Sequence, residues 1–94
     1  MKVLLKFHGN RAKLEEPLLK VLYWCKYFEE EEKIKNIPEK REDIVKEIFG
    51  EGGISSEKIL NKLKNPDEFF LTHTARKVLE MLYKLYTDGY ASYL

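Results

Sequence analysis

The most regular feature of the sequence is a stripe of apolar residues at helical spacing near its C-terminal end. A spacing of three and four residues predicts an amphipathic helix. We expect this helix over residues 74–87, capped by Thr72 or Thr74 and ended by Asp88-Gly89. A helix with one apolar face must bury that face against other elements, so the chain is constrained to pack helices around a shared core. The stripe consists of Ala75, Val78, Leu79, Leu82, Leu85 and Tyr86.

Three further segments show the same periodicity between proline and glycine residues. Residues 17–36 predict a long helix with Pro17 in its first turn, where the missing N–H is not needed. Residues 39–49 predict a second helix that ends at Gly50, and residues 55–64 a third with Ser55 as its N-cap. The long helix carries two apolar stripes: Leu18, Val21, Leu22, Cys25 and Phe28, and Leu19, Tyr23, Trp24 and Tyr27.

The two chain ends have the character of strands. Residues 2–8 alternate imperfectly between apolar and polar side chains, and residues 90–94 are aromatic and extended in character. Since a lone strand cannot satisfy its backbone, we expect these two segments to pair. The predicted fold is therefore mainly α, a small bundle of about four helices with a minor two-stranded β-sheet from the chain ends. Residues 1–94 form one domain, divided into an N-terminal strand and long helix (1–38) and a helical part (39–94).

Composition bounds the class of protein. Apolar residues make up 44% of the chain, enough for one core, and charged residues reach 35% with abundant Lys and Glu and no Gln, a composition typical of hyperthermophile proteins. The net charge of +1 and the lack of a strong basic patch exclude a general nucleic-acid coat protein. No segment has the pattern of a signal peptide or a membrane span, so we expect a cytoplasmic protein.

Catalytic patterns are missing from the sequence. It contains no glycine-rich phosphate loop, no nucleophile elbow and no His and Glu at metal-ligand spacing. His8 and His73 are isolated, and Cys25 lies in an apolar stripe, which favours a small core residue over a reactive thiol. We therefore predict a non-enzymatic protein without a metal or a cofactor.

The order of the predicted elements after Pro38 is similar to that of a known family of folds. Helices over 39–49, 55–64 and 74–87 are followed by Asp88-Gly89-Tyr90, and Gly53-Ile54-Ser55-Ser56 precedes the second of them. This succession resembles the winged helix-turn-helix family over residues 39–94. The resemblance implies a winged-helix-like fold and a DNA-binding regulator in which the last long helix is the recognition helix. It places His73, Thr74, Arg76 and Lys77 towards duplex DNA, although Arg76 and Lys77 also fit a solvated surface on which Glu80 balances their charge.

Aromatic residues support a second hypothesis. Tyr23, Trp24 and Tyr27 share one flank of the long helix, and Tyr and Trp are enriched at the centres of protein interfaces. These residues predict a protein–protein interaction or structural module that acts as a homodimer. The alternative is that the aromatic residues pack inside the monomer. Composition and motifs do not decide between a DNA-binding regulator and an interaction module.

Overall fold

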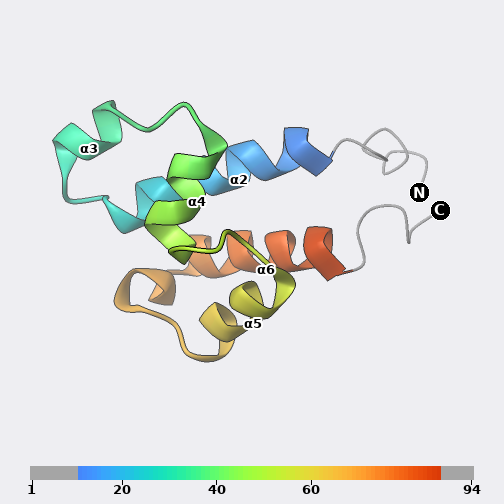
Figure 1. Cartoon of the computed structure of the whole chain (residues 1–94). Helices are drawn as coiled ribbons and strands as arrows, with labels where there is room; N and C mark the ends of the chain where they lie inside the picture. Colours follow the sequence, from blue (N-terminus) through green and yellow to red (C-terminus); the bar gives the residue numbers. More distant parts are fainter. Residues whose placement is uncertain (1–10, 88–94) are drawn as a thin grey trace, which may run out of the picture.

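The computed structural model describes residues 11–87, and within them it gives the side chains of all residues except 11–13 and 69. The regular elements are all helical (Figure 1). They are the α-helices α2 (Arg11–Lys26), α3 (Glu31–Lys35), α4 (Arg41–Phe49), α5 (Ser56–Lys64) and α6 (His73–Thr87), and the 3-10 helix η1 (Glu68–Leu71).

Helix α6 is central to the packing. It runs antiparallel to α2 on one side and packs against α5 on the other, while α4 crosses α2 (Figure 1). The core is formed by side chains from α2, α4, α5, η1 and α6 and from Tyr27, which follows α2 directly. The predicted stripe of α6 is confirmed for Ala75, Val78, Leu79, Leu82 and Leu85, which are all buried, while its last member, Tyr86, is half-buried against the core.

The predicted two-stranded sheet is wrong. Across residues 11–87 every regular element is helical and no strand forms, so the predicted mainly α, winged-helix-like fold with a minor two-stranded sheet is corrected to one built of helices alone over these residues. The physical reason is that α2, α4, α5, η1 and α6 close the core by packing helix against helix, and this core needs no sheet to cover it. The segments 2–8 and 90–94, which the prediction paired, lie outside the described residues.

The predicted long helix is also different. Helix α2 begins at Arg11, so Pro17 lies inside it, and it ends at Lys26 instead of continuing to residue 36. A turn follows in which the Glu30 N–H donates to the Tyr27 carbonyl at 2.8 Å, and α3 is a separate helix without buried residues. The buried face of α2 combines members of both predicted stripes and includes Leu19, Leu22 and Tyr23.

Local signals give the remaining boundaries. The Ser55 hydroxyl accepts from the Lys58 N–H at 3.2 Å, and the Thr72 hydroxyl accepts from the Ala75 N–H at 3.2 Å, so both predicted caps are confirmed. Helix α4 ends at Gly50, whose φ is 81°. Residues that carry a Cβ atom rarely adopt this backbone angle. Between α5 and α6, η1 places the Phe70 ring in the core.

A buried ion pair joins α2 to α4. The Glu15 carboxylate is 4% exposed and accepts from the Nε and Nη2 of Arg41, the latter at 3.1 Å. Arg41 Nη2 also donates to the Tyr86 hydroxyl of α6 at 3.0 Å. One guanidinium therefore connects the three helices at the end of the molecule where α2 begins and α6 ends.

Candidate functional site

The start of α6 is the region that the sequence predicts to contact DNA. The Thr72 cap fixes where this helix begins, and the Arg76 N–H then donates to the Thr72 carbonyl at 3.1 Å. Ala75 points into the core at this end, as do Val78 and Leu79 one turn later. Because consecutive residues are about 100° apart around a helix, the residues between them face outwards.

All four predicted DNA-binding residues are exposed in the first turns of α6: His73, Thr74, Arg76 and Lys77. They do not share one face. His73 and Lys77 are four residues apart and therefore lie above one another on the outer side of the helix. Arg76 is turned towards α5, where its Nη1 donates to the Leu63 carbonyl at 3.3 Å. The arrangement separates Arg76, which links α5 to α6, from His73 and Lys77, which face solvent.

The charge around this surface is mixed, because Glu80 is exposed on the same side of α6, three residues after Lys77 and four after Arg76. The first turn of α6 contains no acidic residue. Lys64 is exposed at the end of α5, next to the Leu63 carbonyl that Arg76 contacts, a neighbour that sequence spacing alone does not reveal. Lys62 is neutralised by Asp67 at 2.7 Å. We call His73, Lys77 and Lys64 the basic surface.

The connection between α5 and α6 is longer than in a simple helix-turn-helix. Residues 65–72 separate the two helices and include η1, whereas the usual turn has three or four residues. Phe70 is 1% exposed, so this connection is fastened to the core. The two helices are thus held by a packed segment and by the Arg76–Leu63 hydrogen bond.

The three predicted interface aromatics separate into two environments. Tyr23 and Tyr27 are buried in the monomer with ring centroids 4.7 Å apart, whereas Trp24 is exposed. The Tyr27 hydroxyl donates to the Glu47 carboxylate of α4, and Lys33 Nζ lies 4.3 Å from the centre of the Tyr27 ring. These contacts make Tyr23 and Tyr27 part of the packing between α2 and α4.

The pKa shifts in this region follow from the same contacts. Burial, followed by the hydrogen bond to Glu47, raises the pKa of the Tyr27 hydroxyl well above its ordinary value. The same hydrogen bond, helped by Lys33, Lys26 and Lys46, lowers the pKa of Glu47. Both shifts favour the protonation states that preserve the hydrogen bond at neutral pH.

Cys25 is half-buried near the start of α6. Burial raises the pKa of its thiol, and a hydrogen bond with Thr72 opposes this shift more weakly. The thiol form is therefore favoured over the reactive thiolate. Among the described residues, no three His, Cys, Asp or Glu side chains cluster as metal ligands would.

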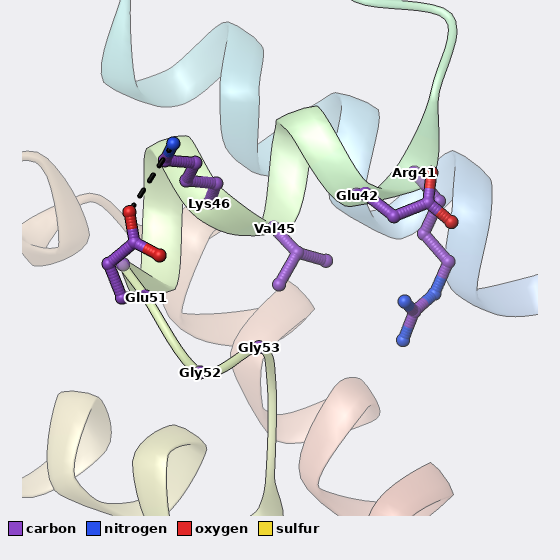
Figure 2. Close-up of a pocket in the computed structure, with 8 residues that line it drawn as sticks. Arg41, Glu42, Val45, Lys46, Glu51, Gly52 and Gly53 are labelled. Carbon is purple, nitrogen blue, oxygen red and sulfur yellow. Dashed lines mark ion pairs between the residues drawn. The ribbon is translucent and has the colours of Figure 1, made fainter.

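A shallow groove of about 270 Å³ lies between α4 and the glycine turn over residues 50–53 (Figure 2). Lys46 and Glu51 form an ion pair of 3.3 Å on its rim. The Lys58 ammonium holds the turn by donating to the carbonyls of Glu51 at 2.6 Å and Gly53 at 2.7 Å. Lys46 and Glu51 are paired within this groove, Arg41 is paired with Glu15 outside it, and the lining offers no arrangement of nucleophile and base.

No helix within residues 11–87 has both the length and the apolar character needed to cross a membrane. Comparisons with protein-family models, with curated proteins and with solved structures find no match to this chain.

Proposed function

We propose that the protein binds duplex DNA through the N-terminal half of α6. The observation that carries this proposal is the exposed pair His73 and Lys77 on one side of α6, with no acidic residue in the first turn and with Lys64 exposed next to the Leu63 carbonyl that Arg76 contacts. Helix N-termini also favour anions, because their N–H groups and dipole are directed at the ligand.

The attachment of α6 to α5 supports the same proposal. A helix that enters the major groove needs a rigid base, since its side chains must reach the base edges in a fixed register. The Arg76–Leu63 hydrogen bond and the packing of Phe70 supply that rigidity. In this proposal Lys77 and Lys64 contact phosphates, while His73 and Thr74 are directed towards the bases.

The test is fluorescence anisotropy with labelled duplex DNA of mixed sequence, first at low salt and then at rising salt. Each phosphate contact contributes about one unit to the slope of log K against log salt. The double variant Lys64→Ala/Lys77→Ala should bind more weakly and lower this slope by about two units. Helical circular dichroism should not change, because both side chains are exposed.

The matched control is Lys35→Ala/Lys40→Ala, which removes the same charge from exposed positions on α3 and before α4. It should bind DNA as the wild type does, apart from a small general effect of net charge. The proposal is refuted if wild-type protein shows no salt-sensitive binding, or if the control loses as much affinity as the double variant.

A further inference from the structure

Helix α2 carries an aromatic face on the side opposite to the core. Trp24 is 42% exposed and Phe28, just beyond the end of the helix, is 60% exposed. Their ring centroids are 4.9 Å apart in an edge-to-face arrangement, which is a favourable aromatic geometry. Pro17 is exposed and precedes them at a spacing that shares this side of the helix, whereas Val21 is partly buried against the core. We call Pro17, Trp24 and Phe28 the outer face of α2.

The outer face is not needed to complete the fold. The buried side of α2, with Leu19, Leu22 and Tyr23, already packs against α4 and α6. Trp24 and Phe28 contact each other, but much of their surface remains in water. The free energy that would be gained by removing this apolar surface from water is therefore not realised in the monomer. Large aromatic side chains of this kind act as anchors at the centres of protein interfaces.

Charge differs between the two ends of the outer face. Phe28 lines a groove of about 680 Å³ between the end of α2 and η1, whose charged lining residues are one lysine, Lys26, and three carboxylates, those of Glu29, Glu30 and Glu68. At the other end Lys20 borders the face, because it lies about 40° from Trp24 around the helix. Lys20 pairs with Glu16 at 3.4 Å, but both side chains are about half-exposed, and such pairs contribute little to stability. Lys20 can therefore change partners at little cost.

We propose that a second copy of this chain covers the outer face, with the two α2 helices antiparallel across a two-fold axis. A two-fold interface brings the same patch of both subunits together, and in the antiparallel arrangement the Lys20 end of one face meets the Phe28 end of the other, where Glu29, Glu30 and Glu68 lie. Lys20 of each subunit then lies towards Glu29 of the partner, while Trp24 and Phe28 of both subunits pack at the centre. A parallel arrangement would instead oppose the carboxylates of the two acidic ends.

The test is sedimentation equilibrium of the full chain over a wide concentration range. Wild-type protein should show a concentration-dependent dimer. The variant Trp24→Ala/Phe28→Ala should raise the dissociation constant of the dimer by about tenfold or more while leaving the helical circular dichroism unchanged. A wild-type protein that remains monomeric would overturn the proposal, and the outer face would then be a binding surface for a different protein. A dimer that persists in the double alanine variant would show that the interface lies elsewhere.

A charge exchange tests the antiparallel arrangement directly. Lys20→Glu and Glu29→Lys should each weaken the dimer, since each variant opposes like charges at both symmetric contacts. The combined Lys20→Glu/Glu29→Lys variant should recover most of the wild-type affinity, because the contacts are rebuilt with their signs exchanged. Lys46→Glu is the matched control, as it also breaks an exposed ion pair but on α4. A combined variant as weak as either single variant would refute the antiparallel dimer.

Discussion

Replacement of Arg41 by methionine should destabilise the protein because it leaves a buried carboxylate without a cation. Glu15 is 4% exposed, and Arg41 is the residue that donates to both of its oxygens. Removing one member of a fully buried ion pair costs about 3–5 kcal/mol. The Arg41 side chain is 43% exposed, so water can reach the site after the substitution and solvate the carboxylate in part. We therefore expect a loss of about 2 kcal/mol for Arg41→Met.

The double variant Glu15→Leu/Arg41→Met distinguishes the cost of an unpaired buried charge from the cost of losing the ion pair itself. It removes both charges and fills the same space with apolar side chains, a change that is often neutral or stabilising for buried pairs. We expect its free energy of unfolding to lie within about 1 kcal/mol of the wild type. The Tyr86 hydroxyl loses its contact with Arg41 in both variants, so that loss cancels in the comparison.

Urea unfolding followed by circular dichroism measures these differences, with the slope of free energy against urea compared between variants. In thermal unfolding, a loss of about 2 kcal/mol in a chain of this size lowers Tm by about 8–16 °C. Lys40→Met is the control, since it removes an exposed cation one residue earlier and should change stability by less than about 0.5 kcal/mol. The reasoning is refuted if the double variant is as unstable as Arg41→Met.

Three further changes test the packing and the caps. Phe70→Ala should cost about 3–5 kcal/mol in urea unfolding, because it opens a cavity at a ring that is almost fully buried. Ser55→Ala should cost about 1 kcal/mol, because the Lys58 N–H loses its acceptor. The lowered pKa of Glu47 gives stability that is present above its ordinary value of 4.5 and is lost as the pH falls through the lower folded value. Glu47→Gln should therefore flatten the loss of Tm with falling pH in this acid range, and an unchanged pH profile would contradict that assignment.

The second half of the described chain could be predicted from local sequence signals. Ser55 and Thr72 each accept a backbone hydrogen bond within three residues, so their role depends on little beyond the neighbouring sequence. The apolar stripe of α6 has one possible face, and the structure buries that face. Phe70 follows Pro66 in a short helical turn, and its ring lies in the core.

Helix α2 could not be predicted in the same way because its sequence offers two apolar stripes. Periodicity alone does not say which stripe faces the core. The choice depends on α4 and α6, which pack on one side of α2 and bury Leu19, Leu22 and Tyr23 while leaving Trp24 outside. Pro17 is a favourable first-turn residue, yet tertiary packing places it inside the helix.

The exposure of the four candidate DNA-binding residues could be predicted from the sequence, but their arrangement could not. His73, Thr74, Arg76 and Lys77 were expected on the exposed side of the last helix, and all four are exposed there. The contact between Arg76 and the Leu63 carbonyl joins residues thirteen positions apart, and helical spacing carries no information about it. The same contact brings Lys64 to the basic surface, which is why this residue was missed.

The two proposals are physically connected through charge. A chain with a net charge of +1 and a small basic surface makes few phosphate contacts, so one copy alone should bind duplex DNA weakly at moderate salt. A two-fold dimer places two basic surfaces on one assembly, and the number of phosphate contacts doubles without any change in sequence. The slope of log K against log salt should then be about twice as steep for the wild type as for Trp24→Ala/Phe28→Ala. Because Trp24 lies on α2 and Phe28 just beyond its end, while the basic surface lies on α5 and α6, the alanine variant leaves every proposed phosphate contact in place. Equal slopes for the two proteins would show that the dimer does not join the two DNA-binding surfaces.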